Sequence, residues 1–212
     1  MFNPASLRLC LVTDRDLAKG RSLIDVVAAA VQGGVTMVQL REKTAPTRVF
    51  LDEARALKAL LSPLQIPLII NDRADIALAV GAEGVHVGQK DMPVTQLRAL
   101  LGPQAIIGLS ITNHQQISAP DAQLPDYLGL GPLYQQNTKT DAATPLGVEG
   151  FRALRAATQK PVVAIGGLKT DNSAPVVAAG ANGLAVVSGL VGADDPRAAA
   201  QAFCRLFASA ER

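Results

Sequence analysis

Residues 67–88 read PLIINDRADIALAVGAEGVHVG, and the order of elements within them predicts the fold. Its first apolar run, residues 68–70, follows Pro67, at a place where a missing N–H does little harm to a strand. A helical segment then begins near Arg73 and closes at Gly81, and a second apolar run follows at residues 85–87. Apolar runs of this kind, separated by a helix, are typical of parallel strands that are buried on both faces.

The same alternation of strand and helix extends in both directions along the chain. The clearest helical segment begins near Thr47, and the apolar residues on one of its faces are Phe50, Ala54, Leu57 and Leu61. Glycines close other helical stretches where a left-handed C-cap is expected, at Gly33-Gly34, Gly81 and Gly102. The short apolar runs that we interpret as strands are residues 9–12, 36–40, 68–70, 85–87, 105–107, 127–130, 162–165 and 184–187.

Eight strand–helix units with short connections specify a parallel sheet with right-handed crossovers. Eight units also favour closure into a (β/α)8 TIM barrel, and 212 residues lie at the small end of the range for one. We therefore predict an α/β fold with a single TIM-barrel domain over residues 1–212. An open, doubly wound sheet stays the alternative, because periodicity alone does not exclude it.

The composition excludes several classes of protein. Although 49% of the residues are hydrophobic, no apolar run approaches the roughly 20 residues that a membrane-spanning helix needs. The net charge of +2 and an aromatic content of 3% argue against a nucleic-acid-binding surface. Residues 1–8 carry no signal-peptide pattern, and Cys10 and Cys204 are expected to be reduced thiols. We expect a cytoplasmic protein whose oligomeric state, a homo-oligomer included, the sequence leaves open.

In a TIM barrel the active site lies at the C-terminal ends of the strands, so the polar residues there are the candidates. The second strand runs into Gln39-Leu40-Arg41-Glu42-Lys43, where period-two alternation puts Gln39, Arg41 and Lys43 on one face and Glu42 on the other. Two cations and an amide on one face suit a polyanion attached to a hydrogen-bonding ring. A solvated loop whose charges pair with one another is an equally good interpretation of the spacing.

Two carboxylates follow neighbouring strands. Asp72 comes directly after the third strand in Asn71-Asp72-Arg73, and Asp91 follows the fourth strand in the loop before Pro93. Mg²⁺ takes one or two carboxylates together with phosphate oxygens and water, so the pair favours a Mg²⁺ site beside bound phosphates. Taken singly, either aspartate is explained as a structural residue, since Asn and Asp are common helix N-caps.

The remaining strand ends offer a second anion site. Ser110 ends the fifth strand, and the sixth opens into a long polar loop in which Lys139 is the one cation. Glycine and small residues end the last two strands, at Gly167 and at Val187-Ser188, where TIM barrels commonly bind a phosphate through backbone N–H groups. His86 lies between two valines, and we interpret it as a core residue.

Taken in order, these segments resemble the thiamine-phosphate synthase family, and the resemblance covers nearly the whole chain. The segments that carry it are Gln39-Leu40-Arg41-Glu42-Lys43, Asn71-Asp72-Arg73, Gly84-Val85-His86-Val87-Gly88-Gln89 with Asp91, Gly108-Leu109-Ser110, Thr138-Lys139 and Ile165-Gly166-Gly167. No single segment is decisive, but the ordered set is specific. The resemblance implies Mg²⁺-dependent coupling of an aminopyrimidine diphosphate to a thiazole phosphate, with loss of pyrophosphate first and capture of the resulting cation by the thiazole nitrogen.

The resemblance also implies roles for individual residues. The pyrimidine diphosphate would contact Gln39, Leu40, Arg41, Glu42, Lys43, Asn71, Ser110 and Lys139, of which Arg41, Lys43, Ser110 and Lys139 are the catalytic candidates. Asp72 and Asp91 would hold Mg²⁺. The thiazole phosphate would contact Gln136, Asn137, Thr138, Gly167, Val187 and Ser188.

One segment departs from the family pattern. The family usually has Pro-Thr-x-Thr-Lys after the sixth strand, whereas this chain has Gln135-Gln136-Asn137-Thr138-Lys139. The Gln136 amide can donate and accept hydrogen bonds as a threonine hydroxyl does, and the loss of proline at position 135 predicts a less rigid loop.

Three other functions remain open on sequence alone. A relative of the thiazole tautomerases would share the barrel but is expected to lack the full set of cations and carboxylates. A non-catalytic, phosphate-ligand-binding regulatory barrel would not need two aspartates for a metal. A barrel enzyme acting on sugar phosphates would leave residues 41–43 unexplained.

Overall fold

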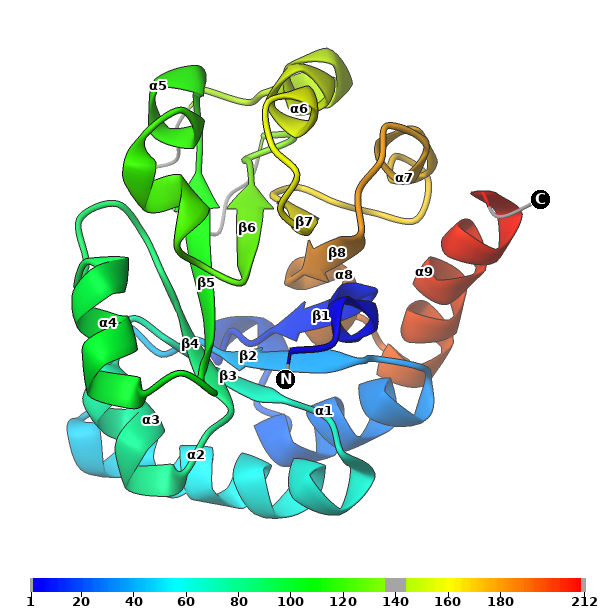
Figure 1. Cartoon of the computed structure of the whole chain (residues 1–212). Coiled ribbons are helices and arrows are strands. Elements are labelled where there is room, and N and C mark those ends of the chain that lie inside the picture. The colour runs from blue at the N-terminus through cyan, green and yellow to red at the C-terminus, as the bar shows by residue number, and fades with distance from the viewer. Residues whose placement is uncertain (1, 136–143, 211–212) are drawn as a thin grey trace.

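Eight parallel strands pair in chain order, and β8 pairs with β1, so the sheet closes into a barrel (Figure 1). The computed structural model describes residues 2–135 and 144–210. The strands are β1 Leu9–Val12, β2 Met37–Leu40, β3 Leu68–Asn71, β4 Gly84–Val87, β5 Ile106–Ile111, β6 Tyr127–Leu130, β7 Val162–Ile165 and β8 Gly183–Val186. The closure confirms the predicted TIM barrel and excludes the open sheet.

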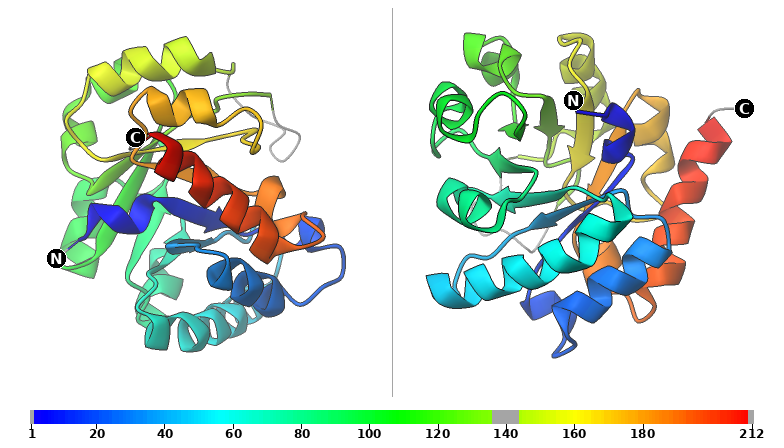
Figure 2. Two further views of the ribbon diagram at one scale, coloured as in Figure 1. Left: turned by 90° about the vertical axis from the view of Figure 1, so that its right-hand side faces the viewer. Right: turned by 60° about the horizontal axis from the view of Figure 1, so that its bottom comes forward.

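Helices surround the strands on the outside (Figure 2). They are α1 Leu23–Gln32, α2 Thr47–Leu61, α3 Ala74–Val80, α4 Val94–Leu101, α5 His114–Ile117, α6 Gly147–Ala156, α7 Ala174–Ala178, α8 Ser188–Val191 and α9 Pro196–Ala210. Single 3-10 turns occupy Pro4–Leu7, Asp16–Ala18, Ser62–Leu64 and Pro120–Gln123. Among the described helices, none is both long and apolar enough to cross a membrane.

The strands divide the apolar residues between two cores, because successive side chains of a strand point to opposite faces. In β1, Leu9 and Leu11 pack outward against the helices, whereas Cys10 and Val12 point into the barrel. The buried face of α2 is the one predicted from its spacing, and it belongs to the outer core. Polar side chains that point into the inner core are buried away from water, so each of them needs a hydrogen-bond partner there.

The helix ends follow the predicted glycines. Gly81 adopts the left-handed conformation, with φ +63°, and ends α3 as expected. At the predicted pair Gly33-Gly34, Gly33 itself lies at φ −85°, and the positive φ of +109° falls on Gly34, directly after it. A Cβ at Gly33 would come within 2.3 Å of the Arg197 carbonyl oxygen, so glycine is required there by the close approach of α9.

The close approach of neighbouring strands gives a stability prediction at Gly84. A Cβ at this position would lie 1.8 Å from the Ile106 carbonyl oxygen, so Gly84→Ala forces the backbones of β4 and β5 apart. We expect a loss of about 3 kcal/mol in the free energy of unfolding, measured by urea denaturation. Gly81→Ala is the matched control, because nothing lies within 4 Å of that position and only the left-handed backbone is strained. It should cost about 1 kcal/mol, and equal losses for both variants would contradict the steric argument.

Candidate active site

The polar residues of β2, β3 and β4 meet at the C-terminal end of the barrel. Gln39 of β2 donates from Nε2 to Asn71 Oδ1 of β3 over 2.7 Å, and both side chains are buried. Paired strands bring these residues together although 32 positions separate them in the chain. The two amides form a polar floor beneath the loops that follow the strands.

Asp72 stands above this floor in an unusual backbone conformation. Its φ is +62°, a left-handed value that costs a non-glycine residue about 1–3 kcal/mol. Aspartate adopts this conformation more readily than most residues, and it occurs in turns as well as at functional sites. Its Oδ2 lies 2.5 Å from Lys43 Nζ, so the cation after β2 pairs with the carboxylate after β3. The helix α3 begins after Arg73 without a side-chain cap, so the alternative that Asn71 or Asp72 acts as an N-cap is wrong.

Asp91 completes an acidic pair with Asp72. The Gly88 backbone N–H donates to Asp91 Oδ2 over 2.7 Å, which fixes the carboxylate in the loop after β4. Partial desolvation raises the pKa of Asp91, the Gly88 N–H lowers it, and the neighbouring charge of Asp72 raises it, so the pKa lies above its usual range. A bound cation would relieve this repulsion between the two carboxylates.

The donor set fits Mg²⁺ held together with a phosphorylated ligand. Within residues 2–135 and 144–210, no group of three or more His, Cys, Asp or Glu side chains is arranged to hold a metal ion. Mg²⁺ rarely takes such a full protein cage, and is usually held by one or two carboxylates, phosphate oxygens and water. Asp72 and Asp91, which come together as predicted from adjacent strand ends, supply that number of carboxylates.

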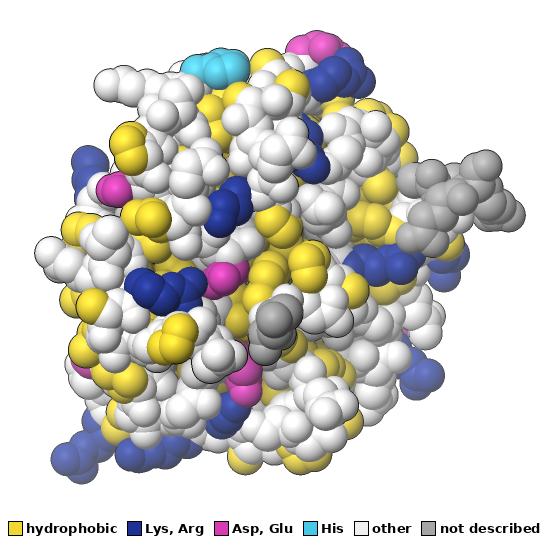
Figure 3. Space-filling view, viewed as in Figure 1, with side chains coloured by type: hydrophobic (Ala, Val, Ile, Leu, Met, Phe, Trp, Pro, Cys, Tyr) yellow, Lys and Arg dark blue, Asp and Glu magenta, His cyan; other side chains and the backbone are white. Residues whose placement is uncertain are grey.

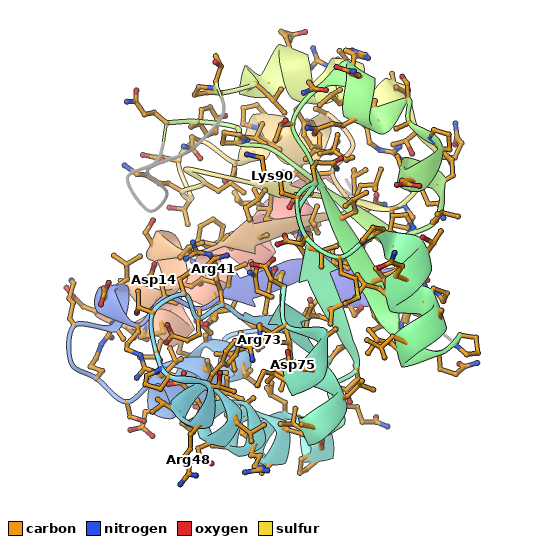
Figure 4. All side chains as sticks on the ribbon, turned by 90° about the vertical axis from the view of Figure 1, so that its left-hand side faces the viewer. Asp14, Arg41, Arg48, Arg73, Asp75 and Lys90 are labelled. Atoms are coloured by element: carbon orange, nitrogen blue, oxygen red, sulfur yellow. The ribbon has the colours of Figure 1, made fainter. Side chains whose placement is uncertain are left out.

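Arg41 enters the same mouth from β2, supported by residues that the sequence did not single out. The buried Thr13 hydroxyl accepts from the Arg41 N–H over 2.9 Å and donates to the Arg41 carbonyl over 3.3 Å. Asp14 lies 3.9 Å from the Arg41 guanidinium, and Figure 4 shows the two side by side, with Lys90 farther along the mouth. A polar residue directly after the apolar run of β1 is the signal that would have indicated Thr13.

Glu42 faces away from this cluster, as the alternation predicts. It accepts from the backbone N–H groups of Thr44 (2.8 Å) and Ala45 (3.0 Å) and from the guanidinium of Arg15 (3.0 Å). Desolvation alone would raise the pKa of Glu42, but these donors outweigh it and lower the pKa to about 2. Glu42 therefore stabilises the loop that carries Arg41 and Lys43, and its own contact with a substrate stays a prediction.

Leu40 and Ser110 occupy two further places in the strands. The Leu40 side chain is fully buried in the outer core, so only its backbone is available for contact with a ligand. Ser110 lies within β5, where its Oγ is 2.9 Å from His86 Nε2 and its carbonyl accepts from Gln89 Nε2 over 2.7 Å. His86 is buried, as predicted, but it also contacts a candidate site residue, which its position between valines did not reveal.

The ends of β7 and β8 form the other half of the mouth. Gly167 adopts φ +67°, and a Cβ there would lie 2.8 Å from Tyr134 Cβ and from the Gln135 carbonyl oxygen. The segment after β6 thus packs directly on the glycine turn after β7. Val187 precedes α8, which begins at the exposed Ser188. Gln136, Asn137, Thr138 and Lys139 lie outside the described residues.

The opposite end of the barrel does not suit phosphorylated ligands. A cavity of about 560 Å³ opens there, and its lining includes Asn3, Gln65, Glu83 and Gln104 but no cation among the described residues. Its one charged lining residue, Glu83, pairs with Lys58. On the face that carries the N-terminus, Lys and Arg side chains are scattered rather than gathered into a patch (Figure 3).

Comparison with known proteins gives one consistent result. A family described as thiamine monophosphate synthase matches residues 9–190. The chain is 59% identical to a thiamine-phosphate synthase of Albidiferax ferrireducens over 196 residues, covering 92% of this chain and 89% of that protein. It is 50% identical to a thiamine-phosphate synthase of Azorhizobium caulinodans over 212 residues, covering 100% of both.

Solved structures agree. A thiamine phosphate pyrophosphorylase from Pyrococcus furiosus superimposes with a TM-score of 0.88 at 34% identity, over 98% of each chain. A 3-hexulose-6-phosphate synthase superimposes with a TM-score of 0.65 at 16% identity, over 94% of this chain and 99% of that one, which is a likeness of fold alone.

The lowered pKa of Glu42 predicts a pH-dependent contribution to stability. Because its folded-state pKa of about 2 lies below the ordinary 4.5, the contribution is fully present above pH 4.5 and is lost as the pH falls through about 2. Glu42→Gln should lower the free energy of unfolding at pH 7 by on the order of 1–2 kcal/mol, measured by urea denaturation. The gap between variant and wild type should close toward pH 2.

Glu53→Gln provides the control. Burial raises the pKa of Glu53, which also pairs with Arg15, so its charge is disfavoured in the folded protein and the pH trend should run the other way. A constant gap for Glu42→Gln across this pH range would contradict the assigned role of the carboxylate.

Proposed function

The chain belongs to the thiamine monophosphate synthase family, and from this premise we propose that its barrel mouth couples an aminopyrimidine diphosphate to a thiazole phosphate, giving thiamine phosphate and pyrophosphate. The enzyme is a transferase that acts on small molecules. The observation that carries the proposal is the cluster of Lys43, Asp72 and Asp91 at three neighbouring strand ends.

The diphosphate half of the site follows from this cluster. Asp72 and Asp91 would hold Mg²⁺, and the ion when bound neutralises charge on the diphosphate. Lys43 and Arg41 would bind the same oxygens, and Lys43 would then exchange its contact with Asp72 for one with the ligand. Gln39 and Asn71 offer amide groups below them for the pyrimidine ring.

In the proposed reaction, bond breaking comes first. The bond between the pyrimidine methylene carbon and the diphosphate oxygen breaks, and its electron pair leaves with pyrophosphate. Arg41, Lys43, Ser110 and Lys139 would stabilise the charge that grows on this leaving group, which requires no general base. Loss of pyrophosphate leaves the pyrimidine methylene carbon as a cation, and the thiazole nitrogen supplies the electron pair for the new carbon–nitrogen bond. The rate of this second step depends on how close the nitrogen is held to that carbon.

The thiazole phosphate would lie on the other side of the mouth. Gly167, Val187 and Ser188 support this assignment because they end the strands at which TIM barrels commonly bind phosphate. We assign Gln136, Asn137 and Thr138 to the same substrate on the family resemblance. A cytoplasmic location is part of the proposal, and the free thiols of Cys10 and Cys204 support it.

The reaction itself is the first test. The purified protein with both substrates and Mg²⁺ should release pyrophosphate and form thiamine phosphate in equal amounts, measured by coupled phosphate detection and chromatography. Chelation should abolish turnover, and added Mg²⁺ should restore it. A folded protein that binds the thiazole phosphate without releasing pyrophosphate would instead support a thiazole tautomerase-like or non-catalytic relative.

Replacement of one metal-site carboxylate is the second test. Asp91→Asn keeps an oxygen for the Gly88 N–H but removes the charge offered to Mg²⁺, so kcat/KM should fall about 100-fold. Binding of the thiazole phosphate, measured by calorimetry, should stay unchanged. The control is Asp52→Asn on the exposed side of α2, where the carboxylate pairs only with Arg55 among the described residues. Full activity of Asp91→Asn at limiting Mg²⁺ would remove Asp91 from the metal site.

A further inference from the structure

The barrel interior contains a slot that holds His86 against Tyr127. His86 on β4 and Tyr127 on β6 are both register partners of Gly108 on β5, so the three lie in one layer of the barrel. A Cβ at Gly108 would come within 2.3 Å of both His86 Nδ1 and Tyr127 Cζ. The missing side chain between them is therefore what allows the two rings to meet.

A second glycine makes room for the upper edge of the same ring. Gly129 on β6 is the register partner of Ser110, one layer closer to the active-site mouth. A Cβ at Gly129 would lie 3.0 Å from His86 Cε1 and 3.4 Å from Nε2. His86 thus spans two layers, with Tyr127 below it and Ser110 above it.

Two hydrogen bonds connect the three side chains in series. Tyr127 Oη lies 3.0 Å from His86 Nδ1, and Ser110 Oγ lies 2.9 Å from His86 Nε2. Within the described part of the chain, the Tyr127 hydroxyl makes no other hydrogen bond and is buried. Burial also raises the pKa of Tyr127 well above its usual range, so the hydroxyl keeps its proton.

This arrangement decides where the imidazole proton sits. The Tyr127 hydroxyl proton has one acceptor, His86 Nδ1, and a buried hydroxyl proton without an acceptor is costly. Nδ1 must then be unprotonated, which puts the proton of the neutral ring on Nε2. The Nε2–H donates to Ser110 Oγ, so the Ser110 proton has to point to a different acceptor.

We propose that Tyr127 and His86 are positioning residues that hold Ser110 as a hydrogen-bond donor to the bound pyrimidine diphosphate. This inference rests on the proposed function for the identity of the ligand, but the proton arrangement itself does not. With the opposite tautomer, Ser110 would donate to His86 and offer only lone pairs to the substrate. The series of hydrogen bonds from Tyr127 through His86 to Ser110 therefore determines which kind of substrate atom Ser110 recognises.

The tautomer can be read directly, because His86 and His114 are the only two histidines of the chain. Nitrogen-15 labelling of histidine and a multiple-bond proton–nitrogen spectrum of the full chain should show His86 with Nε2 protonated and Nδ1 unprotonated. His114→Asn identifies the second set of signals, which comes from an exposed residue at the start of α5. An Nδ1-protonated or doubly protonated His86 in the wild-type protein would overturn the proposal.

Tyr127→Phe tests the cause of the arrangement. It removes the hydroxyl and keeps the ring, so the His86 signals should move toward a mixture of tautomers. The kcat/KM for the pyrimidine diphosphate should fall about tenfold, with the KM for the thiazole phosphate within about twofold. The chain's other tyrosine is the matched control: Tyr134 Oη donates to the Asn172 carbonyl, and Tyr134→Phe should leave the His86 signals unchanged.

A double-mutant cycle separates positioning from a loss of structure. If Tyr127 acts through Ser110, the pair Tyr127→Phe and Ser110→Ala should be no slower than Ser110→Ala alone. If the losses in kcat/KM of the two single variants multiply in the double variant, the proposal that Tyr127 acts through Ser110 is overturned. Should Tyr127→Phe fail to fold, the wild-type tautomer still decides the proposal. A protein with the expected tautomer but no synthase turnover would refute the proposed function and leave the proton arrangement standing.

Discussion

The pairing of β8 with β1 closes the sheet into a barrel and so creates both its inner core and its mouth. Each strand of a closed barrel is hydrogen-bonded on both sides, and its side chains alternate between an inner and an outer core. Most of the strands are only four residues long, so a residue that follows an apolar run emerges at once at the mouth. The pairing of β2 with β3 and of β3 with β4 brings Arg41, Asp72 and Asp91 to one side of that mouth, although they come from three separate units of the chain.

The charges at the mouth stabilise the loops and also leave a site for a ligand. Lys43 pairs with Asp72, and Glu42 is held by Arg15 and by backbone N–H groups. Asp91 differs from these, because partial desolvation and then the nearby charge of Asp72 raise the pKa of its carboxylate. Two carboxylates that repel each other beside a lysine and an arginine form a site that gains stability when a cation and a polyanion bind together.

The barrel interior shows how an apparently apolar strand carries a polar network. His86 is flanked by valines that point outward, so its own side chain points inward with the small inner core. Gly108 and Gly129 leave the volume that its ring occupies. The same register that fills the barrel therefore aligns Tyr127, His86 and Ser110 from the buried core toward the mouth.

The eight-fold alternation, the buried face of α2 and the strand-end residues could be predicted from the sequence, because they depend on local periodicity and on the polarity of the residue that follows each apolar run. It also indicated the family through the ordered set of segments. It did not reveal that Gly33 is required by the close approach of α9, since the clashing atom belongs to Arg197. Nor did it show that Asp72 leaves the helix uncapped and turns to Lys43.

The pairings of Thr13 with Arg41, of Glu42 with Arg15 and of His86 with Ser110 depend on the tertiary structure, because the two residues of each pair are at least 24 positions apart. Such pairings depend on strand register and on the volume left by glycines of neighbouring strands. The local pattern of a single segment shows neither the strand register nor this volume. Both are set when neighbouring strands pair in the barrel.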